Sequence, residues 1–225
     1  MISLSPWALV GVVVAVAALA GIVAGAISRA RRLDRLHQRI IASRDALSRL
    51  LLRRASEASL LAHTRHFAGA DAMEELARAY IDDGGDHLTT DGLDRRTTTT
   101  SRCDRAEVAA RLERASALSR AIRDTLTPSV REDLAADPQA RARLEALDAT
   151  CYRIELARNV HNVDVAGARA LRSARMVKLL RLAGHAPIPE PIDFDDDTHV
   201  GGRDHPLGRP GRRLPAEQDQ RRLHR

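Results

Sequence analysis

Polar side chains capable of hydrogen-bonding and acid–base chemistry are most concentrated between Arg158 and Asp164, a stretch that also holds Asn159, His161 and Asn162. On a helix, residues three or four positions apart lie on neighbouring parts of one face, which brings Arg158, His161 and Asn162 together. One interpretation is a buried polar layer that fixes the register of neighbouring helices. The alternative is a membrane-bound enzyme or metal-dependent sensor that uses His161 with Asp164. We favour the polar layer, with His161 pointing into the protein, and we assign no catalytic residue.

The same alternative could use His63 and His66, which are three residues apart. Zinc sites need three or four protein ligands, and the sequence signals no third ligand near this pair. Two cysteines, Cys103 and Cys151, are too few for a disulfide framework and match no zinc spacing. The sequence also contains no glycine-rich phosphate loop, no G-x-S-x-G elbow and no H-E-x-x-H motif. We therefore expect no metal site, no cofactor and no enzymatic activity.

An acidic segment at residues 82–101, DDGGDHLTTDGLDRRTTTTS, has the Gly, Asp and Thr content of a loop. A calcium-binding loop requires the order D-x-D-x-D-G with a glutamate at position twelve, and this order is absent. We therefore predict that residues 82–101 form a flexible, solvated linker.

The composition predicts the type of element that must position these residues. Only 2% of the 225 residues are aromatic, whereas β-strands are enriched in aromatic and β-branched side chains. Ala, Leu and Arg dominate instead, and all three favour helix. The fold class predicted from this composition is all-α. The net charge of +6 does not indicate nucleic-acid binding, because the arginine-rich C-terminal end lacks aromatic residues on which bases could stack.

The stretch 7–27 contains no charged residue. A helix of this length matches a hydrocarbon core of ~30 Å, and Trp7 suits a membrane interface. No Lys or Arg precedes it and three arginines lie between residues 29 and 32, so the positive-inside rule places residues 1–6 outside the cell membrane and the rest in the cytoplasm. A cleaved signal peptide would carry its positive charge before the apolar run. We therefore predict a single-pass anchor in contact with the lipid bilayer.

Helical periodicity dominates the chain beyond the anchor. Capping signals at Thr127-Pro128 and Asp137-Pro138 mark helix starts. The predicted helices cover residues 28–67, 71–81, 104–126, a short segment from Pro128, and 138–183. We predict that residues 28–184 form an elongated antiparallel helical bundle. Residues 185–225, rich in Pro, Asp and Arg, are predicted to be a disordered tail.

The segment CYRIELARNVHNVDV, residues 151–165, resembles the C-terminal signature of the LemA family, in which Ala-Arg is followed after two residues by Tyr-Asn and later by Val. The corresponding positions in this sequence are Ala157, Arg158, His161, Asn162 and Val165. The resemblance extends over about residues 30–192 and identifies a divergent branch of bacterial single-pass membrane proteins. It implies one N-terminal membrane helix, a cytoplasmic bundle of long helices and no established catalytic activity.

Together these features predict a non-enzymatic, membrane-anchored bundle that acts as an interaction or scaffold module at the inner face of a bacterial membrane. Its expected partners are the lipid bilayer and either another protein or a second copy of the chain.

Overall fold

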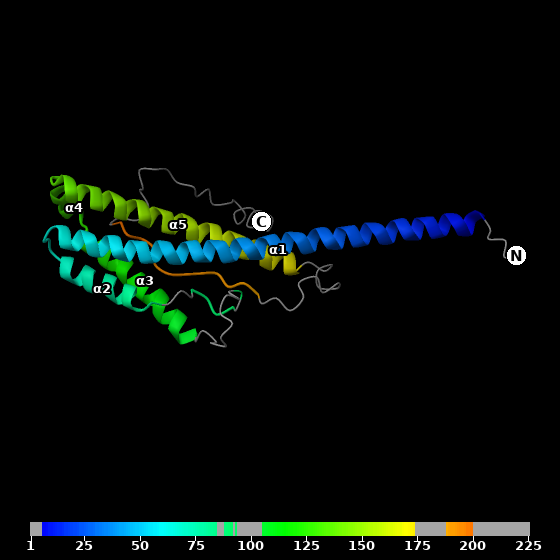
Figure 1. Cartoon of the computed structure of the whole chain (residues 1–225), viewed down its shortest axis with the longest axis horizontal. Helices are drawn as coiled ribbons and strands as arrows, with labels where there is room; N and C mark the ends of the chain where they lie inside the picture. Colours follow the sequence, from blue (N-terminus) through cyan, green and yellow to red (C-terminus); the bar gives the residue numbers. More distant parts are fainter. Residues whose placement is uncertain (1–5, 85–87, 92, 94–104, 174–187, 200–225) are drawn as a thin grey trace, which may run out of the picture.

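The computed structural model describes residues 6–84, 88–91, 93, 105–173 and 188–199 (Figure 1). Its elements are α1 (Pro6–Thr64), α2 (Ala70–Asp82), α3 (Arg105–Thr125), α4 (Pro128–Ala135) and α5 (Pro138–Ser173). These described ranges contain no strand, which confirms the all-α prediction. The predicted start of the third helix at residue 104 and the predicted helix beyond Ser173 lie outside the described residues.

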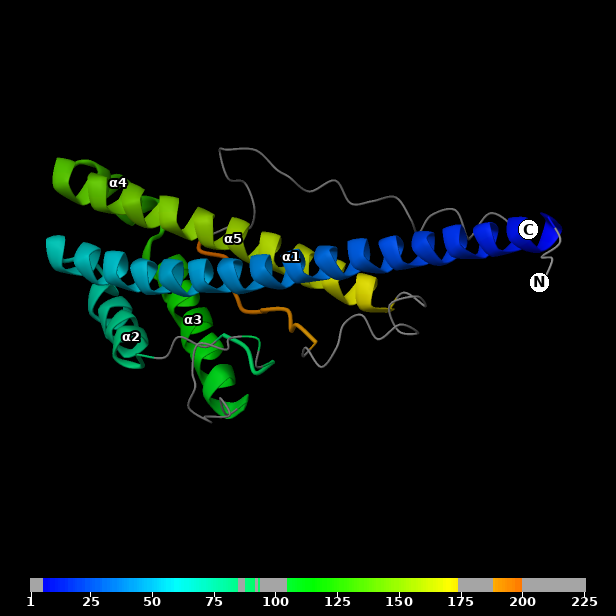
Figure 2. The same cartoon turned by 45° about the vertical axis from the view of Figure 1, so that its right-hand side comes forward.

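The first helix, α1, is a single uninterrupted element of 59 residues. Its N-terminal part is long and apolar enough to cross a membrane, and none of it is buried by the rest of the chain. In Figures 1 and 2 this part extends well beyond the other helices. No proline or glycine occurs between Ala26 and Thr64, so the backbone continues without a break from the apolar part into the packed part.

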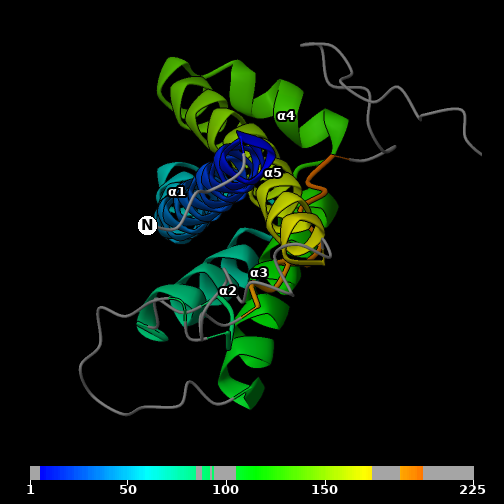
Figure 3. The same cartoon turned by 90° about the vertical axis from the view of Figure 1, so that its right-hand side faces the viewer.

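The C-terminal half of α1 is the common element of the packed region. It contacts α5 and α2 extensively, while α3 packs on α2 and α4 packs on α5. In Figures 1 and 3, α4 lies to one side of the α1–α5 pair and α2 with α3 to the other. The core between them contains Leu47, Leu51, Leu61, Met73, Leu118, Ile122, Leu147 and Ile154.

Local signals set the helix starts in this region. The Thr127 hydroxyl accepts a hydrogen bond from the Val130 N–H at 3.5 Å, and Pro128 occupies the first helical turn of α4. Asp137 plays the same part for α5, because its Oδ1 accepts from the Gln139 N–H at 2.9 Å. Both capping predictions are confirmed. Gly69 precedes α2 with φ of 84°, and a Cβ there would lie 2.9 Å from the Thr125 hydroxyl, so this turn requires glycine.

The prediction of a disordered tail from residue 185 is wrong for residues 188–199, which we call the C-terminal strap. The strap is extended and runs along α5 toward α3 (Figures 1 and 2). Prolines at 189 and 191 disfavour helix, while Ile192 and Phe194 alternate into the main core and are buried there. The strap is therefore part of the packed structure.

The prediction of a solvated linker over residues 82–101 is also wrong for residues 88–91 and 93, whereas residues 82–84 are exposed. Leu88, Thr89, Asp91 and Leu93 are all buried. Leu88 joins the main core, and Leu93 joins a smaller cluster with Ile40. We call residues 88–91 and 93 the acidic loop; these residues pack against α1 and contact the strap.

Candidate functional site

His161 lies at the meeting point of α5, α1 and the C-terminal strap, and its side chain is fully buried. Its Nδ1 is 2.9 Å from the Ser43 hydroxyl of α1, and its Nε2 is 3.4 Å from the Glu190 carbonyl oxygen of the strap. A carbonyl oxygen can only accept, so an imidazole proton on Nε2 would be donated to Glu190. The single proton of the Ser43 hydroxyl is donated either to Nδ1 of His161 or to the Ile40 carbonyl oxygen, which lies 3.0 Å away. Burial lowers the pKa of His161 below its ordinary value, and the positive charge of Arg44 lowers it further. His161 is therefore neutral at pH 7. Its burial confirms the prediction that its side chain points into the protein.

Asn162 binds the strap through both ends of its amide. Its Nδ2 donates to the Ile192 carbonyl oxygen at 2.9 Å, and its Oδ1 accepts from the Ile192 N–H at 3.0 Å. Two turns further along the same helix face, Arg169 donates from Nε to the Pro189 carbonyl oxygen at 2.8 Å. These side chains supply the backbone partners that a neighbouring strand would supply in a sheet.

Two arginines hold the acidic end of the strap. Arg158 of α5 binds the Asp196 carboxylate with two parallel hydrogen bonds, at 2.7 and 2.9 Å. Its guanidinium carbon also lies 5.8 Å from the centre of the Phe194 ring. From α3, Arg123 donates to the Asp197 carbonyl oxygen at 2.8 Å and pairs with Asp195 at 3.3 Å. The bidentate Arg158 pair fixes the orientation of the strap as well as its charge.

A buried ion pair links α1, the acidic loop and the strap. Arg44 donates to both carboxylate oxygens of Asp91, at 3.0 and 2.7 Å, and both side chains are almost completely buried. The same carboxylate accepts from the backbone N–H groups of Leu93 at 3.1 Å and Glu190 at 2.9 Å. Burial raises the pKa of Asp91, but the hydrogen bonds and charge of Arg44 outweigh it and hold this pKa below its usual value. Asp91 is thus an ionised anchor at pH 7.

Sequence reasoning missed Arg44 and Asp91, which are 47 positions apart and belong to no motif. It also missed Arg54, a fully buried arginine in the C-terminal part of α1. Arg54 donates to the Ser119 hydroxyl at 2.7 Å and to the Ala115 carbonyl oxygen at 2.8 Å, so it joins α1 to α3. Burial lowers the pKa of Arg54.

The polar layer was predicted to fix the register of neighbouring helices. In the structure, most of its side chains bind the C-terminal strap instead. Asn162 and Arg158 bind the strap, and only His161 reaches a facing helix, through Ser43. The other two signature positions carry packing contacts: Ala157 is half-buried against the main core, and Val165 is buried in the smaller cluster.

The metal-dependent alternative gains no support from the geometry. Within the described ranges, no group of three or more His, Cys, Asp or Glu side chains is placed to hold a metal ion. His63 lies 3.1 Å from Glu74, and His66 is exposed. Cys151 is buried and burial raises the pKa of its thiol, so it is a protonated core residue. Cys103 lies outside the described residues.

The chemistry that this arrangement can perform is recognition of an extended peptide segment. The α5 face offers an amide for one peptide unit and guanidinium groups for carbonyl oxygens and carboxylates, and the strap occupies it. Comparison of the chain with protein-family models, with curated proteins and with solved structures finds no match.

Proposed function

We propose that the chain is a single-pass membrane protein whose helices form an antiparallel, LemA-like bundle. The bundle acts without enzymatic activity as an interaction or scaffold module at the cytoplasmic face of a bacterial membrane. The observation that carries the proposal is the continuity of α1. The N-terminal part of α1 is apolar and unburied. Side chains from the C-terminal half of the same helix form part of the main core. A helix with this division of polarity suits a protein that spans the bilayer at one end and folds in water at the other.

The distribution of charge supports an orientation with the N-terminus outside. Residues 1–6 contain no Lys or Arg, whereas arginines 29, 31, 32, 35 and 39 follow the apolar segment closely. Arginines beside a membrane helix are retained on the cytoplasmic side. The bundle and the strap then lie in the cytoplasm.

An exposed apolar stripe on α5 supports the role in protein interaction. Leu156, Val160 and Val163 are 49%, 49% and 71% exposed, and their spacing of four and three residues places them on one helix face. None of these side chains contributes to the described cores. A partner helix, or α5 of a second copy, would bury this stripe as one side of a coiled-coil contact.

Topology and contact are tested together in intact membranes. A reporter that is active only in the cytoplasm, fused after Arg225, is expected to be active. A photo-crosslinking residue at Val163 is expected to capture a partner or a second copy, whereas the same residue at Glu155, an exposed polar position on the same helix, is the matched control. An inactive reporter at this position, together with activity of a second reporter that works only outside the cytoplasm, would contradict the proposed topology. Equal capture at both positions would contradict the α5 stripe as an interaction surface.

A further inference from the structure

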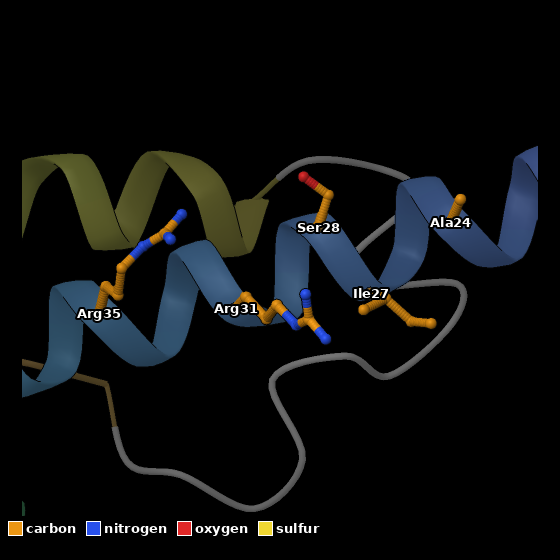
Figure 4. Close-up of a pocket in the computed structure, with 5 residues that line it drawn as sticks. All are labelled: Ala24, Ile27, Ser28, Arg31 and Arg35. Carbon is orange, nitrogen blue, oxygen red and sulfur yellow. The ribbon is translucent and has the colours of Figure 1, made fainter.

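An open depression lies on α1 where its apolar part ends. Its volume is about 450 Å³, and its described lining residues are Ala24, Ile27, Ser28, Arg31 and Arg35 (Figure 4). The spacing of three and four residues places all five on one helix face. Along the helix axis, this face changes from apolar groups, through one hydroxyl, to two guanidinium groups.

The two arginines have no partner among the residues that the structure describes. Arg31 and Arg35 are exposed, and neither forms a hydrogen bond or ion pair with the residues that the structure describes. The nearest carboxylate in sequence, Asp34, accepts instead from Gln38 at 3.4 Å. Further along α1, Arg53 pairs with Glu57 at 2.7 Å. Two neighbouring guanidinium groups without a carboxylate partner among the described residues are available to an external anion.

The direction of the side chains indicates where that anion lies. Side chains on a helix lean toward its N-terminus, which for α1 is the apolar end. In Figure 4, Arg31 and Arg35 both lean toward this end, and Arg31 extends toward Ile27. Arg31 begins ~6 Å beyond Ile27 along the axis, and the headgroup layer of one leaflet is ~5–8 Å thick. The guanidinium groups therefore reach the depth at which lipid phosphates lie.

We infer that this face of α1 binds one anionic phospholipid. The acyl chain lies on Ala24 and Ile27, and the phosphate accepts from Arg31 and Arg35, whose planar donor groups match phosphate oxygens. A zwitterionic headgroup brings its own ammonium group close to two guanidinium groups, so the site prefers a headgroup with net negative charge. This inference rests on the proposed function, because it requires α1 to cross a bilayer.

The test uses the full chain in nanodiscs made either of phosphatidylcholine alone or of phosphatidylcholine with phosphatidylglycerol. Native mass spectrometry measures how much phosphatidylglycerol each protein retains. The variant combines Arg31→Gln with Arg35→Gln. The matched control combines Arg32→Gln with Arg39→Gln, which removes the same charge from the same helix but outside the depression. We expect the variant to bind phosphatidylglycerol about 30-fold more weakly and the control to lose clearly less.

Each other outcome has a defined meaning. Equal losses in the two double variants would show a diffuse attraction of the basic helix to anionic lipid, and would overturn the site. Displacement of the lipid by inorganic phosphate at equal concentration would assign the site to the free ion and would also overturn the lipid assignment. A chain that inserts but shows no preference for phosphatidylglycerol contradicts this inference alone. A chain that is extracted from membranes by alkaline carbonate contradicts the proposed function itself.

Discussion

The amide of Asn162 binds both backbone polar groups of Ile192, at 2.9 and 3.0 Å, and so attaches the C-terminal strap to the middle of α5. The Ile192 side chain is fully buried in the main core directly beside this contact. A polar attachment and an apolar attachment therefore act at the same strap residue. Most side-chain hydrogen bonds of the signature segment, residues 151–165 of α5, are therefore made with the strap and not with another helix.

Replacing Asn162 by alanine leaves the N–H and carbonyl of Ile192 without their partner. We expect a loss of ~1–3 kcal/mol in the free energy of unfolding, because half-buried backbone groups become unsatisfied. Urea unfolding followed by circular dichroism measures the change. Asn159→Ala is the matched control, since Asn159 is exposed on the same helix and is expected to change stability by less than ~0.5 kcal/mol. Equal effects of the two substitutions would show that the strap contact contributes nothing.

Truncation separates the strap from the residues that follow it. Ending the chain after His199 removes a segment with few large apolar residues, and we expect the melting temperature to stay unchanged. Ending it after residue 187 also removes Ile192 and Phe194, whose burial is worth about 1.5–3 kcal/mol each. We expect a clear fall in melting temperature for the shorter chain only. Similar melting of the two truncated proteins would contradict a structural role for the strap.

Breaking the Arg44–Asp91 pair leaves one buried charge without its counter-ion. For either Arg44→Met or Asp91→Ala, we expect a loss of ~3–5 kcal/mol. The double variant is expected to lose less than the sum of the single losses, because neither charge then remains alone. The double variant is still expected to be less stable than the native protein, because the N–H groups of Leu93 and Glu190 lose their acceptor. Chemical unfolding of all four proteins completes the cycle, and strictly additive losses would argue against coupling of the two residues.

Acidification should loosen the His161 contact. The pKa of His161 is lowered in the folded protein, so below pH 6.5 the unfolded chain binds the proton more readily than the folded one. The stability contributed by the neutral ring is complete above pH 6.5 and is lost as the pH falls toward the folded-state pKa. The neighbouring charges pull in both directions: Arg44 lowers this pKa, while Asp91 and Asp164 raise it.

The measurement is the free energy of unfolding between pH 8 and pH 5 for the native protein and for His161→Gln. We expect the variant to be less stable at pH 8 but to lose less on acidification. Part of the acid sensitivity remains in the variant, because burial and Arg172 also lower the pKa of His37. Parallel curves for the two proteins would exclude His161 as a source of the pH dependence.

The helices were predictable because each carries its own signal. Periodic apolar residues mark the buried faces, and Thr127-Pro128 and Asp137-Pro138 mark the starts of α4 and α5. The burial of His161 followed from the same periodicity, since it shares a face with Ile154 and Val165.

The strap and the acidic loop could not be predicted in this way. Their extended backbones have no hydrogen-bonding pattern of their own, and their burial depends on side chains far away in sequence. Asp91 is held in place because Arg44 binds its carboxylate. Ile192 can be buried because the Asn162 amide binds its backbone N–H and carbonyl groups. In isolation, a segment of prolines and aspartates has the composition of a solvated tail.

Because α1 is unbroken, it forms one continuous helix about 90 Å long. Ser43 and Arg44 belong to this helix. A rotation or axial displacement of α1 would therefore also move the hydroxyl that binds His161 and the guanidinium that binds Asp91. With no proline or glycine between Ala26 and Thr64, no kink-forming residue is available to absorb such a movement. A movement of α1 at Ile27 would therefore also displace the side chains that bind His161 and Asp91.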